Sequence, residues 1–213
     1  MASDTIFHVL RTRTELKDPA GYKEIVDVFG TYTELQAAKK AAREVLLNEG
    51  YEKEWFSVYD LKGDGLDDTW KHGDGMIVYA VAPEVGASEK EGQELFKVFI
   101  ETEQNQLGLS GNEQGLVQES LYYVLQTTIH YDLDRSGAKR ETTVEGTYRR
   151  CTEAKEKATS VLLDCGMSKR DFVEYEENDG SSNWPYGQDI IVRAVAEGGE
   201  NYLVIVVKGK VGG

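Results

Sequence analysis

The chain is poor in cysteine, histidine and proline. Among its 213 residues it has two cysteines, three histidines and three prolines. Cys151 and Cys165 bracket a predicted helix, which at ~1.5 Å per residue would hold them about 21 Å apart. Bridged Cα atoms lie within ~7 Å of each other, so these two cysteines cannot pair across one straight helix. We expect Cys151, which shares an apolar stripe with alanines, to be a buried structural thiol rather than a reactive one.

The three histidines do not form a recognisable metal motif. His8, His72 and His130 have no counterpart elsewhere in the chain and form neither an i,i+4 pair nor a cluster with cysteine. The acidic loop 132–137 matches the first half of an EF-hand, but Thr143 stands where the closing glutamate is needed. Asp, Ser and Gly in this loop are also the residues of tight turns. We therefore expect no metal and no cofactor.

Positive charge and long apolar runs are scarce as well. The chain has 24 Lys and Arg against 38 Asp and Glu, which gives a net charge of −14. Nucleic-acid affinity comes mainly from Lys and Arg that neutralise phosphates, so we expect no nucleic-acid partner. No apolar run approaches the ~20 residues of a membrane helix. Residues 1–10 lack the features of a secretory signal, so we expect no membrane contact and a cytoplasmic location.

What the chain does contain is a second copy of itself. Residues 4–66 align without a gap with residues 120–182, and Gly30-Thr31-Tyr32 pairs with Gly146-Thr147-Tyr148. Slightly later, the Trp-x-x-Gly segment at 70–73 meets the one at 184–187. A repeat of this length indicates duplicated domains rather than a solenoid. We predict a first repeat at 1–103, a linker at 104–119 and a second repeat at 120–213.

Each copy has the same pattern of elements. A hairpin is followed by a helix with apolar residues at helical spacing, then by a short strand and a final hairpin, which gives a β-β-α-β-β-β unit. Thr33 and Gln36 predict a capping box at the first helix, and Gly50 and Gly166 fit helix C-termini. One helix covers only one face of a sheet, yet the strands are apolar on both faces. We predict an α+β fold with two mainly antiparallel sheets packed face to face and the helices outside.

A few residues stand out as candidate functional groups. Arg193 replaces Tyr79 in an otherwise apolar strand, where a cation must reach the edge, pair with a carboxylate or meet an acidic ligand. Together with His8 and Tyr122, these two residues would line a pocket between the two copies. Trp70 and Trp184 precede apolar strands, where an indole either plugs the end of the core or presents a flat binding surface. We favour the plug for both, with an interaction loop as the alternative.

The second copy resembles a family of small uncharacterised bacterial α+β domains. The resemblance rests on the strand Tyr122-Tyr123-Val124-Leu125, the corner Gly146-Thr147-Tyr148, the strand 172–176 and the loop from Trp184 to Gly187. The first copy matches less closely, with Gly30-Thr31-Tyr32 at its corner. The family has a Val-Tyr-Val-Leu strand, a Gly-x-Tyr corner and a Trp-x-x-Gly loop. The resemblance implies the fold and no chemistry.

Two functions from different classes follow. The first is a non-enzymatic binding or protein-interaction scaffold, in which the Trp-x-x-Gly loops or an exposed sheet edge contact an unknown protein partner. The alternative is a small-molecule-binding protein or enzyme with its pocket between the two repeats. No catalytic motif recurs in both copies, which favours the scaffold, although a diverged duplication can keep chemistry in one half. The chain would be a monomer with pseudo-twofold symmetry or a homodimer.

Overall fold

The chain forms two compact units, which are described separately. The computed structural model describes residues 3–16, 24–63, 65, 69–84, 93–137, 139–181 and 183–210. Of these, the first unit contains 3–16, 24–119 and Lys210, and the second contains 120–209. No helix in these ranges is long and apolar enough to cross a membrane.

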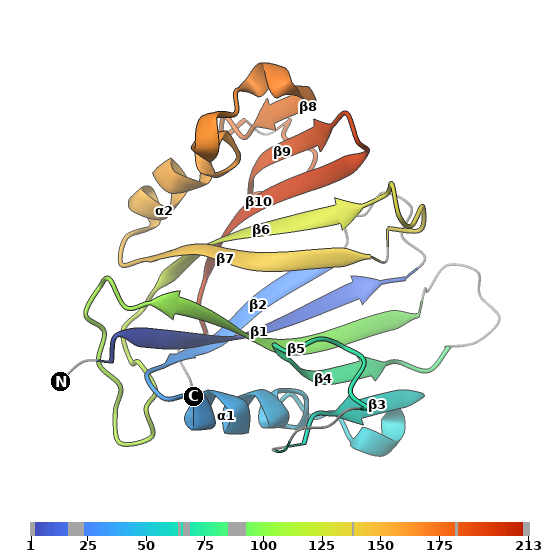
Figure 1. Ribbon diagram of the computed structural model, residues 1–213, viewed down its shortest axis with the longest axis vertical. Helices are drawn as coiled ribbons and strands as arrows, with labels where there is room; N and C mark the ends of the chain where they lie inside the picture. The colour runs from blue at the N-terminus through green and yellow to red at the C-terminus, as the bar shows by residue number, and fades with distance from the viewer. Residues whose placement is uncertain are drawn as a thin grey trace. The chain divides into compact units, whose positions relative to one another are not determined.

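Both units have the predicted order of elements (Figure 1). The first contains β1 (Thr5–Glu15), β2 (Glu24–Tyr32), α1 (Leu35–Asn48), the 3-10 turn η1 (Lys53–Trp55), β3 (Val58–Leu61), β4 (Met76–Val81) and β5 (Glu94–Gln104). The second contains β6 (Tyr122–His130), β7 (Arg140–Tyr148), α2 (Cys151–Ala158), the 3-10 turns η2 (Val161–Gly166) and η3 (Lys169–Asp171), β8 (Phe172–Glu177), β9 (Ile190–Ala196) and β10 (Glu200–Lys208).

The strand order is also the same in both units. The sheets run β2-β1-β5-β4-β3 and β7-β6-β10-β9-β8, and every strand pair is antiparallel. The strands that begin and end each repeat lie side by side in the sheet, and the short third strand, β3 or β8, lies at an edge. The predicted α+β duplication with two antiparallel sheets is confirmed.

Each helix packs on one face of its own sheet, which we call the helix face. Ala38, Ala42, Val45 and Leu46 of α1 lie in one buried cluster with side chains of β1, β4 and β5, including Val9, Val78 and Phe96. In the second unit, the corresponding cluster joins Ala154 and Ala158 of α2 to Val124, Val192 and Val204. The alternate strand residues point to the opposite, second face, as the period of two requires. The face-to-face packing of the two sheets stays a prediction.

The helix ends differ from the predictions. The Thr33–Gln36 capping box is wrong, because α1 begins at Leu35 with no side-chain cap and the Thr33 hydroxyl donates to the Gly115 carbonyl, 3.3 Å away. The second helix is also shorter than predicted, since α2 ends at Ala158 and continues as 3-10 structure. Cys151 is a free thiol that is half-buried rather than buried, while the side chain of Cys165 lies outside the described residues.

The predicted linker is part of the first unit. The carbonyl of Thr31 on β2 accepts a hydrogen bond from the amide of Val117 at 2.8 Å, and the amide of Thr33 donates to Gly115 at 2.8 Å. Leu109 is fully buried, and the Asn105 side chain bonds both the amide and the carbonyl of Leu109. The segment therefore covers the β2 edge of the sheet near Tyr32, and is a structural element of the first unit rather than a free connection.

A glycine lies at the same β-bulge in both units. The register shifts between Val9 and Leu10 opposite Gly30, and between Val124 and Leu125 opposite Gly146. A β-carbon at Gly146 would lie 2.8 Å from the Tyr148 hydroxyl oxygen, which is closer than real contacts allow. The glycine of the Gly-Thr-Tyr motif thus lets the tyrosine ring fold over the backbone at the bulge.

We expect Gly146→Ala to lower the free energy of unfolding by about 1–3 kcal/mol, the usual cost of overpacking. Chemical unfolding measures this change. Gly63→Ala is the control, because a β-carbon at Gly63 meets nothing within 4 Å, and it should change the stability by less than about 0.5 kcal/mol. Equal effects of the two substitutions would show that the ring does not require the glycine.

Candidate functional site

The Trp-x-x-Gly loop of the first unit folds back onto its own sheet. The indole nitrogen of Trp70 donates to the Gly73 carbonyl at 2.8 Å. The His72 ring stacks on Tyr79 of β4, with centroids 4.1 Å apart and an interplanar angle of 12°. Its Nε2 lies 2.7 Å from Oδ2 of Asp60 on β3. Trp70 and His72 also meet edge to face. The loop is therefore tied to two neighbouring strands.

The second unit ties its loop down with the same positions but different chemistry. Tyr186, which aligns with His72, donates its hydroxyl proton to Oε2 of Glu176 at 2.8 Å. Arg193, which aligns with Tyr79, places its guanidinium carbon 5.1 Å from the Tyr186 ring centroid. The Arg193 guanidinium also lies 2.5 Å from Glu174 and 3.0 Å from Glu176. Arg193 thus pairs with carboxylates, one of the three arrangements considered for it.

The nitrogen-containing ring or group and the tyrosine change places between the two units. An imidazole stacks on Tyr79 in the first unit, and the Arg193 guanidinium stacks on Tyr186 in the second, so the sheet residue and the loop residue swap roles. Both Trp70 and Trp184 are half-buried, and Trp184 packs beside the buried cluster of Ile129, Ile190 and Leu203. Such packing is typical of an indole that plugs the end of a core.

His8 joins three strands of the first sheet. Its Nδ1 lies 2.8 Å from the Thr31 hydroxyl on β2, and its Nε2 lies 2.9 Å from Oε2 of Glu103 on β5. Hydroxyl, imidazole and carboxylate follow the order of a catalytic triad. However, the Thr31 side chain is buried, so its hydroxyl is not exposed to a substrate. The arrangement satisfies a buried histidine, as expected for a packed core residue.

The four residues predicted to line a pocket do not gather within either unit. In the first unit, His8 on β1 and Tyr79 on β4 are separated by β5. In the second unit, Tyr122 packs with the cluster of the helix face. Arg193 lies between Val192 and Ala194, which both belong to that cluster, so its side chain projects from the second face. Tyr122 and Arg193 are therefore on opposite faces of one sheet.

A surface hollow of about 540 Å³ lies beside α1. Tyr32, Lys40 and Glu44 line it from β2 and α1, and Glu113 and Leu116 line it from the segment that covers the β2 edge. Burial and the neighbouring Glu44 carboxylate raise the pKa of Tyr32, so its phenol stays neutral at physiological pH. Three glutamates, including Glu34, and one lysine give the hollow a polar lining of mixed charge.

The edge strands β3 and β8 share their inward contacts. Phe56 and Tyr59 pack with ring centroids 5.5 Å apart, and their counterparts Phe172 and Tyr175 do so at 5.4 Å. A lysine lies above the tyrosine in each, at 5.8 Å for Lys53 and 5.2 Å for Lys169. Burial raises the pKa of both tyrosines, and burial together with Glu177 raises that of Tyr175 to about 12. The contacts that the edge strand makes with the interior are therefore the same in both units.

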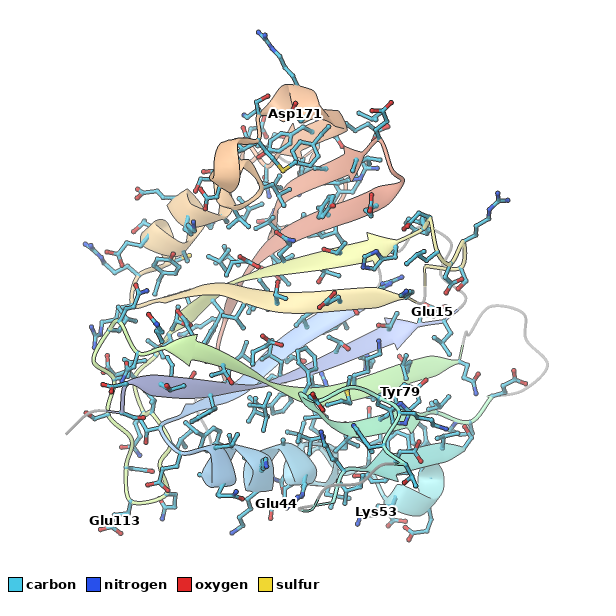
Figure 2. All side chains as sticks on the ribbon, viewed as in Figure 1. Glu15, Glu44, Lys53, Tyr79, Glu113 and Asp171 are labelled. Carbon is cyan, nitrogen blue, oxygen red and sulfur yellow. The ribbon has the colours of Figure 1, made fainter. Side chains whose placement is uncertain are left out.

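The two edges differ at three matched exposed positions, one of which, Asp171, is labelled in Figure 2. On β3 and the turn before it, three large apolar side chains are exposed: Trp55 at 42%, Val58 at 40% and Leu61 at 39%. In the ungapped alignment these positions are Asp171, Glu174 and Glu177 in the second unit. Three exposed apolar residues of the first unit therefore align with three carboxylates of the second. This contrast can be seen in the sequence alignment, but reasoning from residues that both copies share misses it.

Comparison of the chain with protein-family models, with curated proteins and with solved structures finds no match.

Proposed function

We propose that this protein is a non-enzymatic interaction module that binds an extended segment of a partner protein by adding it as a strand beside β3. The observation that carries this proposal is the contrast between Trp55, Val58 and Leu61 on one edge and three carboxylates at the matched positions of the other. Strand addition of this kind uses main-chain hydrogen bonds for affinity and alternate side chains for specificity.

An open edge strand can pair with another chain, so the difference between the two edges bears on function. Backbone groups on the outer side of an edge strand are available to another chain, and proteins normally block such edges with charge. The second unit follows this rule with Asp171 just before β8 and with Glu174 and Glu177 on it, which pair with Arg193 and Lys169, although Val173 on the same strand is 67% exposed. The first unit presents apolar side chains instead, including a tryptophan, the residue type most enriched at binding hot spots. An apolar, strand-forming ligand fits β3.

The occupant is a segment of another protein rather than a second copy of this chain. Each molecule of this protein carries a net charge of −14, so two molecules repel each other and self-association is disfavoured. Val58 and Leu61 are three residues apart on β3 and project from its opposite faces, so they select a segment with β-branched side chains on both faces and without acidic residues. The competing function predicted from the sequence, a small-molecule site lined by Arg193, Tyr79, His8 and Tyr122, stays a prediction.

A synthetic peptide tests the proposal. We would measure the binding of a ten-residue peptide of alternating valine and threonine, with a terminal lysine at each end for solubility, by fluorescence anisotropy. The double substitution Val58→Glu and Leu61→Glu gives β3 the carboxylates of β8, and we expect it to weaken binding at least tenfold, or about 1.4 kcal/mol. The same peptide with a central proline should also bind at least tenfold more weakly, because proline removes a ladder hydrogen bond.

The control places the same charge on the other edge. Val173 on β8 is 67% exposed, so Val173→Glu adds a carboxylate without disturbing the core and should leave peptide binding unchanged. Equal affinity of the wild type and the β3 double variant, at unchanged melting temperatures, would overturn the proposal. So would the formation of dimers through β3 without peptide, because the occupant would then be a second copy.

A further inference from the structure

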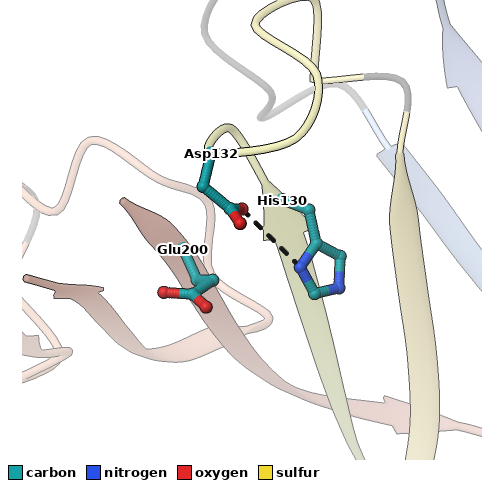
Figure 3. A group of neighbouring side chains, drawn as sticks. All are labelled: His130, Asp132 and Glu200. Atoms are coloured by element: carbon teal, nitrogen blue, oxygen red, sulfur yellow. Dashed lines mark ion pairs between the residues drawn. The ribbon is translucent and has the colours of Figure 1, made fainter. Parts of the chain in front are cut away.

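Three potential metal ligands meet at one end of the second sheet (Figure 3). His130 is the last residue of β6, Asp132 lies in the turn that follows, and Glu200 is the first residue of β10. His130 and Glu200 are direct partners in the β6–β10 ladder. One ligand atom from each residue lies within 4.8 Å of the other two, and His130 Nδ1 is 3.8 Å from Asp132 Oδ1.

The distance between the His130 and Asp132 ligand atoms is close to that between two ligand atoms of one bound cation. Zinc lies about 2.0–2.2 Å from imidazole nitrogen and carboxylate oxygen, so two ligand atoms in a tetrahedral shell are about 3.4 Å apart. The observed 3.8 Å between His130 and Asp132 differs from this value by a side-chain adjustment only. All three side chains are partly or well exposed, which leaves the remaining coordination positions to water.

We propose that His130, Asp132 and Glu200 bind a first-row divalent cation such as Zn²⁺ or Mn²⁺. One nitrogen and two carboxylate ligands favour these ions, because imidazole selects transition metals while Ca²⁺ and Mg²⁺ prefer oxygen-only shells. The proposal is independent of the strand-addition function, since its residues belong to the second unit and the β3 edge to the first.

The duplication shows that the fold does not require these residues. Thr14 aligns with His130, and Leu16 aligns with Asp132. Leu95, which pairs with Thr14 in the β1–β5 ladder, occupies the place of Glu200. None of the three first-unit residues is a metal ligand at this end of its sheet. The second unit therefore has an imidazole and two carboxylates at three positions that threonine and leucine occupy in the first unit.

Calorimetric titration of the full chain with ZnCl₂ and with MnCl₂, after treatment with a chelator, tests the site. We expect one equivalent of metal to bind to the wild type. Removal of a direct ligand should weaken binding by at least the 10–100-fold known for residues one shell further out, so H130A, D132N and E200Q should each lose about tenfold or more. His72→Ala is the matched control, because His72 also lies beside a carboxylate, Asp60, and within the described residues the pair does not form a group of three potential ligands.

A second readout locates the bound metal. Mn²⁺ broadens nearby nuclear magnetic resonances, and the amide signals of residues 129–133 and 199–201 should broaden first. Unchanged affinity in H130A would overturn the proposal, as it would assign the binding to diffuse attraction by the acidic surface. Absence of binding to the wild type, or broadening centred elsewhere, would overturn it equally. Melting temperatures of the variants show whether each remains folded.

Discussion

Replacement of Arg11 by alanine is expected to lower the free energy of unfolding by about 3 kcal/mol or more. The side chain of Arg11 on β1 is only 7% exposed and pairs with Asp27 on β2 and with Glu49 at the end of α1. Its guanidinium carbon also lies 5.3 Å from the Phe29 ring centroid. Breaking a buried ion pair by removing one partner typically costs about 3–5 kcal/mol, because the remaining charge is left uncompensated.

Lys210 moderates this loss. Lys210 donates its backbone amide to Val28 at 2.9 Å, and its Nζ lies 3.1 Å from Asp27 and 3.9 Å from Glu49. A second cation therefore stays beside both carboxylates when Arg11 is removed. For this reason we place the expected loss at the lower end of the range.

Unfolding in denaturant measures the effect. The fluorescence of Trp55 and Trp70, in a Trp184→Phe background, reports on the first unit alone. Arg13→Ala is the control, because Arg13 is 34% exposed and pairs with Glu94 at 3.4 Å, so its loss should cost less than about 1 kcal/mol. Equal costs for Arg11 and Arg13 would contradict a buried charge network at this end of the sheet.

Phe96→Ala should destabilise the first unit by about 3–5 kcal/mol, the range found when a buried phenylalanine is reduced to alanine. Phe96 on β5 is fully buried at the centre of the helix-face cluster. Its ring centroid lies 5.3 Å from that of Tyr51 and 5.6 Å from that of Phe56, in edge-to-face contacts. The substitution therefore leaves a cavity and removes two aromatic contacts.

The same tryptophan fluorescence follows this transition. Phe96→Leu is the graded comparison, since leucine fills most of the ring volume and should cost clearly less than alanine. A loss below about 1 kcal/mol for Phe96→Ala would mean that the surrounding side chains collapse into the cavity, and that the aromatic cluster does not hold β3 and α1 against the sheet.

The order of elements was predictable because the two copies align over nearly their whole length, with one two-residue shortening in the second copy. Each turn signal and each helical stripe appears twice, so agreement between copies supports every assignment. The details that failed depend on tertiary contacts. The Thr33 capping box is absent because Gly115, from the supposed linker, takes the threonine hydroxyl. The face-to-face packing of the sheets and the family resemblance remain predictions.

Of the two candidate sites, one depends on tertiary contacts and the other could be read from the sequence. Residues 130, 132 and 200 have no common spacing, and the ladder between β6 and β10 alone brings His130 beside Glu200. The expectation that the histidines form no metal motif considered only neighbours in sequence. By contrast, the divergence between Val58 and Glu174 was readable from the alignment. Its meaning depended on knowing that β3 and β8 are edge strands.

The most direct test of the account is to observe both edges of the wild-type protein while the valine–threonine peptide is added. Backbone amide signals of β3, Val58–Leu61, and of β8, Phe172–Glu177, can be followed in one nuclear magnetic resonance titration. We predict that the β3 amides shift and become protected from hydrogen exchange while those of β8 do not change. Equal shifts on both edges, or shifts on neither, would contradict the claim that the first unit alone has kept an edge open for a partner strand.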